Sequence, residues 1–440
     1  MTRLDHTSQS SRFLLIGFIF ACLYALTKIH TPSGISNAVG APMVLLGLYS
    51  IYRYGKGLSV KIPMLLLLVS IIIPLISWYF AHDSYPELTD DSPRLGKMAR
   101  IFLFIPLAWW LKDSPKKVFI FLGLASLPIL FSPWISGGSW QEIAIGWSGS
   151  KRIDFGLRNH PEHASLFFGF VLVGLVCFAP RIFRYSKYLF ALLVPAIMFC
   201  AFTIIATQTR ASWVALIGAI SICLLYFICT GLKKEYLQPR YLLVFTLVLL
   251  TSCLVVFKSM GHIVEKRSGA ESGVIEHILS GDIENVPYTS IGIRIHMWRA
   301  SFAKIEERPL TGWGNNGQSI AIDQTAWMPD HIKHDFGHIH NIYIALLTNY
   351  GLFGLIFYLV WVGWLLTKVL KAVSKNLLNR DIGYFSIATI SFWSVTSIFE
   401  SYLFFWTGVL CLQITFAAIL ALIWQAEIKE KQQQDNQTPQ

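Results

Sequence analysis

The chain has 440 residues, of which 54% are apolar and 14% are charged, and its mean hydropathy is +0.53. Charged residues make up about a quarter of ordinary soluble domains, so this composition excludes a soluble globular protein. The formal net charge of +11 lies mostly in short connections between apolar segments. It therefore reports membrane topology, and nucleic-acid binding is not needed to explain it.

Apolar segments recur along the whole chain, and about twelve are long enough to be transmembrane helices. This predicts an all-α integral membrane fold. The first segment lacks a small-residue cleavage site, so we expect it to be a retained helix. The predicted spans are 13–29, 36–52, 63–80, 98–111, 118–135, 163–180, 188–206, 211–230, 241–257, 341–366, 382–399 and 406–425.

Basic residues mark alternate connections between the predicted spans. By the positive-inside rule these connections face the cytoplasm, and both termini are then cytoplasmic as well. Three long connections lie on the external side, at 81–97, 136–162 and 258–340. The basic residues are Arg53, Lys56, Lys61, Lys112, Lys116, Lys117, Arg181, Arg184, Lys187, Lys233, Lys234, Arg240, Lys368, Lys371, Lys375 and Arg380.

The longest external connection divides the chain. We expect nine helices within 1–257, a large external loop at 258–340, three helices within 341–425, and a disordered cytoplasmic tail at 426–440. Apolar residues within the loop recur at spacings of three and four, which predicts an amphipathic helix on the membrane surface, with Trp298 at head-group depth. These residues are Ile295, Trp298, Phe302 and Ile305.

Four histidines crowd the end of this loop, directly before an apolar segment. Histidine takes up and releases a proton near neutral pH, so His338 and His340 are the first candidates for chemistry. His340 precedes Asn341 at a predicted helix start, and we expect it to be a catalytic base. A zinc site made by all four histidines is an alternative, although their spacing matches no common zinc signature. His331 and His334 are expected to be surface residues.

Arg210 ends the sequence TQTR between two predicted spans, so it must lie at or just inside the external membrane interface. A charge at that depth is costly, and such residues are functional candidates. A guanidinium group offers five donors that match phosphate oxygens. If the external loops fold over Arg210, then Arg294, Arg152 and Arg158 converge with it on one anionic group. The alternative role of each is contact with lipid phosphates.

Acidic residues give weaker signals. Asp90 and Asp91 in the first external loop could hold a divalent metal, but a single acidic pair is more often part of a solvated loop. The same interpretation applies to His160, Glu162 and His163 in the sequence HPEH. We therefore expect neither a metal nor a cofactor.

The histidine motif resembles the signature of a known family. His340 and Asn341 are followed, after nine residues, by Gly351 and Gly354 in the sequence GLFG. This pattern resembles the His-Asn and Gly-x-x-Gly signature of the bacterial O-antigen ligase and polysaccharide polymerase superfamily.

Three further motifs are similar to the ligase branch, and they occur in the same order. They are RIDFGLRNH, which is the loosest match, then TQTRASW, and then SIGIRIHMW followed by PLTGWG. The resemblance covers about 152–354, and the large loop before the histidine adds to it.

The resemblance implies a GT-C-like enzyme of the bacterial inner membrane with a periplasmic active site. Its implied reaction is O-antigen ligation, in which a glycan moves from undecaprenyl diphosphate to a lipid A-core sugar hydroxyl without a nucleotide sugar or a metal. By position, His340 corresponds to the essential histidine of the family, and Arg210 and Arg294 to its essential arginines. Arg152 and Arg158 are carried over only by the loosest motif.

The residues themselves suit this chemistry. A sugar bound to diphosphate already has a good leaving group, so the enzyme needs a base for the incoming hydroxyl and fixed positive charge for the diphosphate. His340 would be the base, with His338, Asn341 and Trp298 as supporting residues. No carboxylate is convincingly placed as a nucleophile, so we expect inversion in one step.

Two alternatives remain at this stage. An O-antigen or exopolysaccharide polymerase of the same superfamily would use the same base and arginines on a growing glycan. A secondary transporter would place its charged site near the membrane midplane and show two related halves. Here the candidate residues collect at the external face, which favours the enzyme.

Overall fold

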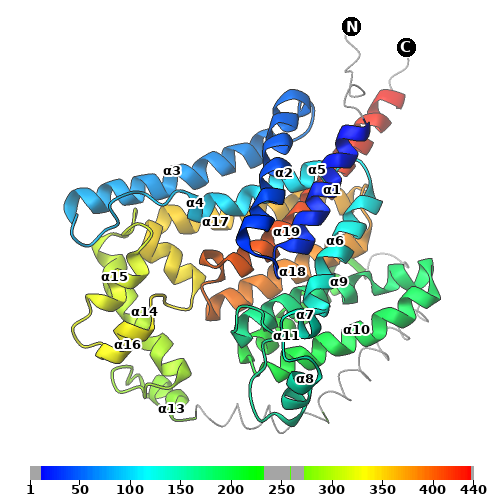
Figure 1. Ribbon diagram of the computed structural model, residues 1–440. Coiled ribbons are helices and arrows are strands. Elements are labelled where there is room, and N and C mark those ends of the chain that lie inside the picture. Colours follow the sequence, from blue (N-terminus) through cyan, green and yellow to red (C-terminus); the bar gives the residue numbers. More distant parts are fainter. Residues whose placement is uncertain (1–10, 232–257, 259–271, 438–440) are drawn as a thin grey trace.

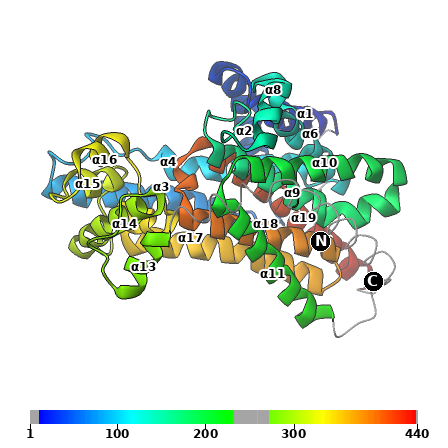
Figure 2. The ribbon, with the colours of Figure 1, turned by 90° about the horizontal axis from the view of Figure 1, so that it is seen from below.

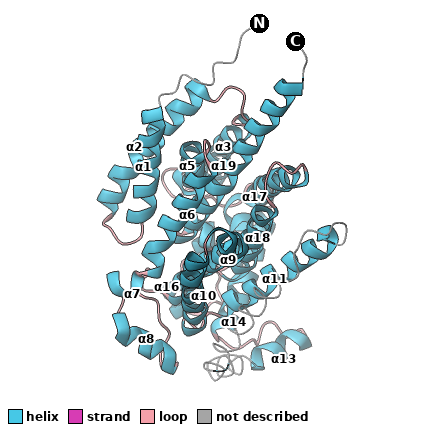
Figure 3. Ribbon diagram, turned by 90° about the vertical axis from the view of Figure 1, so that its right-hand side faces the viewer, coloured by secondary structure: helices cyan, strands magenta, loops and turns pink. Residues whose placement is uncertain are grey.

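The computed structural model describes residues 11–231, 258 and 272–437, and every regular element within them is a helix (Figures 1 and 3). Eight of these helices are long and apolar enough to cross a membrane. The chain is therefore an all-α, multi-pass membrane protein, as the composition predicts. The eight are Ser33–Tyr54 (α2), Lys61–Ser84 (α3), Pro161–Tyr185 (α9), Lys187–Ala206 (α10), Arg210–Gly231 (α11), Ile342–Ser374 (α17), Arg380–Phe399 (α18) and Trp406–Gln437 (α19).

Three further predicted spans fall on shorter helices, and the span at 241–257 lies outside the described residues. The first helix, Ser11–Thr27 (α1), is apolar throughout. The prediction of one helix over 98–111 is wrong, because the chain forms Gly96–Ala99 (α4), the 3-10 turn Arg100–Leu103 (η1) and Phe104–Leu111 (α5). Every residue of α5 is buried, so it is a core helix and is too short to span a bilayer. The fifth predicted span is divided into Pro115–Leu130 (α6) and Ser132–Ile135 (α7).

Helix α19 is the centre of the bundle, since 94% of its apolar stretch is buried inside the protein. It packs against α5, α6, α9 and α17, while α9, α10, α11 and α18 form an adjoining group (Figure 2). The start of α1 and the end of α19 lie at one end of the molecule, and Ser139–Ser148 (α8) and Ser272–Ser280 (α13) lie at the other (Figures 1 and 3). This agrees with a topology that separates the termini from the long connections.

The end of α19 departs from expectation. The predicted disordered tail begins at 426, but the helix continues to Gln437. Two glutamates fasten this extension to α17, since Glu427 lies 3.7 Å from Lys368 and Glu430 lies 2.6 Å from Lys375. These ion pairs join adjacent helix ends, and local composition alone does not reveal them.

The loop predicted to be external folds into helices that share a small core with the start of α17. Besides α13 it contains Ser290–Glu307 (α14), Gly317–Asp323 (α15) and Asp330–Asp335 (α16), gathered beside the end of α3 (Figures 1 and 2). The predicted helix within the loop is α14, and of its predicted apolar face Ile295, Trp298 and Ile305 are partly buried while Phe302 is exposed. The buried core is Met297, Ala300, Ile322, Met328, Ile332, Ile339, Ile344 and Ala345.

Helix α17 is interrupted where the loop meets it. Gly351 has φ 61° and ψ −160°, which a helix does not allow. At this break the main chain of the PLTGWG motif pairs with α17, because Leu352 N donates to Pro309 O and Trp313 N donates to Thr348 O. A Cβ atom at Gly351 would lie 2.2 Å from the carbonyl carbon of Leu310. Gly351, the first glycine of the GLFG motif, is therefore needed because any side chain there would prevent the main chain of α17 from approaching the main chain at Leu310.

We predict that Gly351→Ala lowers the thermal unfolding midpoint markedly, with a loss of at least about 2 kcal/mol, because the left-handed backbone and the clash with Leu310 both oppose a side chain. Thermal unfolding of purified protein in detergent measures this. Gly363→Ala in the same helix is the matched control, since nothing lies within 4 Å of its Cβ position. Equal midpoints for the two variants would contradict this account of the break.

Candidate active site

His340 occupies a fixed position at the start of α17. The side chain of Asn341 caps this helix, because its Oδ1 atom accepts hydrogen bonds from the main-chain N–H groups of Tyr343 and Ile344. His340 itself has φ 52°, a left-handed conformation that costs an ordinary residue about 1–3 kcal/mol. The cap and the strained residue together turn the imidazole away from the helix and into the protein, where it is 8% exposed.

The imidazole of His340 is paired with a buried carboxylate. Its Nδ1 atom lies 2.7 Å from Oε2 of Glu400, and Nε2 of His338 lies 3.4 Å from the other carboxylate oxygen. The two imidazole rings are 4.1 Å apart. An ionised carboxylate only accepts hydrogen bonds, so Nδ1 of His340 is the donor. In the neutral ring this leaves Nε2 with the lone pair that a general base requires.

Glu400 is held in its ionised form. Burial alone would raise the pKa of this carboxyl, but the charge of His340 and the hydrogen bonds from both histidines hold it well below its usual range. Glu400 is 3% exposed. Glu400 is the first residue after α18. Residues 400–405 connect α18 to α19, and we call them the 400–405 segment. A negative charge fixed there lies opposite the imidazole of His340, where it can offset positive charge that develops in a reaction.

Several hydrogen bonds hold the chain around His340. Nε1 of Trp298 on α14 donates to the carbonyl of Ile339 at 2.9 Å. The side-chain oxygen of Gln318 accepts from Ile339 N and from the Ser401 hydroxyl. Trp298 is partly buried and supports the histidine loop through this bond, and its expected position at head-group depth stays a prediction.

Two of the predicted arginines, Arg294 and Arg152, lie at a second carboxylate, Glu162 at the start of α9. Nη2 of Arg294 donates to Oε1 of Glu162 at 3.2 Å, and Nη2 of Arg152 lies 3.9 Å from the same oxygen. Arg152 also donates to the main-chain oxygen of Thr207 and to the hydroxyl oxygen of Thr209, and both threonines belong to the TQTR turn. This turn places Arg210 at the first position of α11.

Arg158 belongs to the histidine side of the site. Its guanidinium lies 4.3 Å from the centre of the Phe405 ring, and the His338 ring lies 5.0 Å from the same ring. Burial lowers the pKa of Arg158, and the negative charge of Glu400 raises it. The two groups are therefore close enough to interact electrostatically. Arg158 has φ 64°, a second strained residue at this site.

The 400–405 segment joins the two groups. Glu400 holds the histidines, Phe405 contacts Arg158, and the Tyr402 hydroxyl donates to the main-chain oxygen of Glu162 at 3.0 Å. One short segment thus contacts the histidine pair, Arg158 and the residue around which the other arginines gather. The structure therefore brings most of the predicted residues to one region of the molecule, although they come from separate parts of the chain.

Sequence reasoning missed one residue of this region and misjudged two others. Glu400 was not considered, although a lone acidic residue between two predicted spans is a functional signal in itself. HPEH was expected to be a solvated loop, and His160 is exposed. The expectation is wrong for the other two residues, because Glu162 accepts from Arg294 and His163 is 5% exposed and hydrogen-bonded to Thr407.

One group of side chains has donors spaced for a metal ion. The ligand atoms of His338, His340 and Glu400 lie within 4.8 Å of one another, and two histidines with a glutamate form a known zinc ligand set. The suggested site of four histidines does not form, since His331 and His334 are exposed. Asp90 is paired with Arg94 at 2.9 Å and is not part of a metal-binding group among the described residues.

Comparison with known proteins identifies the central part of the chain. Residues 195–359 match the family model described as O-antigen ligase. This segment is an O-antigen ligase family domain. It contains Arg210, Arg294 and His340, and it ends before Glu400. The match confirms the resemblance to the ligase and polymerase superfamily that the motifs indicate, and it supports an enzymatic role in general.

A relative from Haemophilus influenzae extends the match. It is an uncharacterised protein that is 24% identical to this chain over 356 residues, which is 77% of this chain and 80% of the relative. The similarity therefore reaches well beyond the family domain, although this relative adds no function.

We predict that Glu400→Gln reduces turnover about 100-fold, because the amide keeps the hydrogen-bonding shape but removes the negative charge opposite His340. Glycan transfer by purified protein measures this, and kcat should fall while the KM for the glycan donor changes little. The control is Glu427→Gln, which removes a carboxylate at the far end of α19. Unchanged kcat in Glu400→Gln would exclude an electrostatic role for this residue.

Proposed function

We propose that this protein is an O-antigen ligase of the bacterial inner membrane. It would transfer a glycan from undecaprenyl diphosphate to a sugar hydroxyl of lipid A-core, with the active site on the periplasmic face. The observation that carries the proposal is the buried pair of His340 and Glu400 beside clustered arginines. A base and fixed positive charges are what this transfer requires.

His340 is the general base of the proposed reaction. Its Nε2 atom takes the proton of the acceptor hydroxyl as that oxygen attacks the anomeric carbon. The bond from this carbon to the diphosphate oxygen breaks with its electron pair, and undecaprenyl diphosphate leaves. The attack occurs opposite the leaving group, so the configuration at the carbon inverts. No covalent enzyme intermediate is involved.

Arg210, Arg294 and Arg152 would bind the diphosphate. In the structure the Glu162 carboxylate accepts from Arg294 and lies 3.9 Å from Arg152, which holds both guanidinium groups in place before the substrate arrives. A diphosphate offers more acceptor oxygens and more negative charge than one carboxylate, and Arg side chains bind such groups through paired hydrogen bonds. Arg158 lies nearer to His338 and would contact the sugar side of the donor.

We predict that a strain lacking this protein makes lipopolysaccharide without O-chains, while lipid-linked O-antigen of normal length accumulates. His340→Ala should fail to restore ligation although the protein is inserted normally, because no base then receives the proton. The lipopolysaccharide banding pattern of the complemented strain measures this. Shortened glycans on the carrier lipid would point to the polymerase, and normal banding with His340→Ala would exclude the proposed base.

We also predict that EDTA leaves the transfer rate unchanged in purified protein, since arginines supply the positive charge that a metal would otherwise provide. The rate with and without chelator is compared in detergent, with a metal-dependent glycosyltransferase as a positive control. Loss of activity that one particular divalent ion restores would overturn this. It would then assign His338, His340 and Glu400 to a metal.

A further inference from the structure

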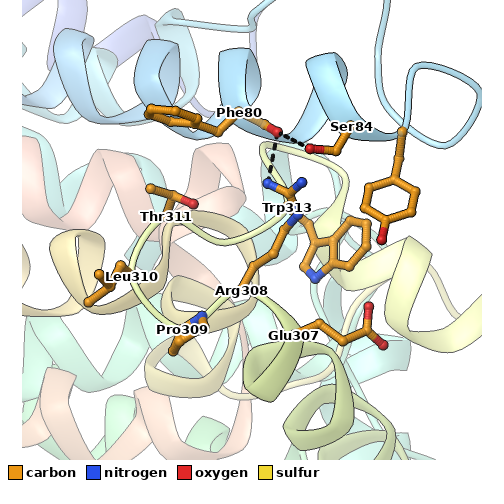
Figure 4. A pocket seen from close by; sticks show the side chains of 9 residues that line it. Phe80, Ser84, Glu307, Arg308, Pro309, Leu310, Thr311 and Trp313 are labelled. Atoms are coloured by element: carbon orange, nitrogen blue, oxygen red, sulfur yellow. Dashed lines mark hydrogen bonds between the residues drawn. The ribbon is translucent and has the colours of Figure 1, made fainter.

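A second site lies away from the histidines, where the last turn of α3 faces the end of α14. It is a cavity of about 430 Å³ lined by both elements and by the loop that follows α14 (Figure 4). One wall thus belongs to a membrane helix and the other to the external helices. The lining residues are Phe80, Ser84, Tyr85, Glu307, Arg308, Pro309, Leu310, Thr311 and Trp313.

Arg308 is the cation of this cavity. One of its nitrogens donates to the main-chain oxygen of Phe80 at 2.8 Å, as Figure 4 shows. Its guanidinium lies 5.4 Å from the Tyr85 ring and 5.2 Å from the Trp313 ring. The side chain is therefore held in place by an aromatic pair and a carbonyl. Among the described residues, no carboxylate forms an ion pair with it, and its other N–H groups can receive an anion.

The charges around Arg308 favour an anionic ligand. Lys304 lies 5.0 Å from the Trp313 ring and pairs with Glu307 at 2.8 Å. Arg308 and Glu307 line the cavity, and Lys304 lies next to this lining, so the three groups together carry a net charge of +1. In Figure 4 the carboxylate of Glu307 lies across the cavity from Phe80.

The surroundings of the cavity are those of a lipid surface. Phe80 is 50% exposed and Leu310 is 53% exposed. Leu352 and Phe353 are also exposed, and their main-chain N–H groups bond to the loop at Pro309 and Leu310. Exposed large apolar side chains on a membrane helix contact lipid. Tyr, Trp and Arg beside them are typical of the depth at which lipid head groups lie.

We propose that this cavity binds the phosphate of a membrane-lipid head group. Arg308 and, more weakly, Lys304 would bind the phosphate oxygens, and the acyl chains would lie along Phe80 and Leu310. The site is separate from the proposed diphosphate site. It lies beside the break at Gly351, about 15 Å along α17 from Asn341 at the helical rise per residue. The proposal does not depend on which glycan the protein transfers.

Native mass spectrometry of the full chain in detergent tests the proposal, with phosphatidylglycerol as the probe and diacylglycerol of the same chains as the control. We expect the wild type to bind phosphatidylglycerol and Arg308→Gln to bind it about fivefold more weakly, the factor for one basic residue at a membrane surface. Arg94→Gln, an exposed arginine of the neighbouring loop, should bind it like the wild type.

Two further variants keep the test informative if Arg308→Gln folds poorly. Glu307→Gln removes the carboxylate of the cavity and should strengthen binding about twofold to fivefold, whereas Leu310→Glu adds one and should weaken it. A purely structural role of the cavity predicts no such opposite effects. Equal binding by all variants, or equal binding of diacylglycerol, would overturn the proposal. Inorganic phosphate that displaced the lipid fully at low concentration would show a site for free anions and would also overturn it.

Discussion

The active-site region depends on one buried charge. A carboxylate that is 3% exposed needs donors on both oxygens, because an unpaired ion in such a place costs several kcal/mol. His340 donates to one oxygen of Glu400, while the main-chain N–H of Ser401 donates to the other, which also lies 3.4 Å from His338. Pairing of Oε2 therefore requires the start of α17 and the 400–405 segment to come together. The same contact fixes which nitrogen of His340 carries its proton. A requirement of stability thus also selects the form of the ring that can act as a base.

The second carboxylate has a different role. Glu162 sits among arginines and balances their charge, so these side chains can be held close together before any ligand binds. The 400–405 segment links it to the histidines through Tyr402. Two carboxylates in one region therefore serve two purposes, since one modifies a base and the other organises cations. Such a division requires contacts between distant parts of the chain, and both carboxylates lie outside the matched family domain, 195–359.

The sequence allowed the helical membrane fold and the main candidates to be predicted, and the reasons are physical. Spans such as α9, α10 and α18 are recognisable because a lipid-crossing helix must be continuously apolar. His340 and Arg210 stand out because polar groups are rare beside such spans. Glu400 and Glu162 could not be assigned their partners, since the contacts join residues 60 and 132 positions apart. Core helix α5 was mistaken for a span because burial in protein and burial in lipid select the same residues.

The break in α17 limits how the molecule can move. Main-chain hydrogen bonds from Trp313 and Gly314 to α17, and from Leu352 and Phe353 back to the loop, fasten the external helices to a membrane helix. Such bonds have fixed geometry on both partners, so this edge cannot act as a hinge without losing several of them at once. A rearrangement that admits the two lipid-linked substrates proposed for this protein would therefore begin on another side of the helices between 272 and 340. The contact between residues 309–314 and α17 at Gly351 would keep its geometry while other sides of this region open.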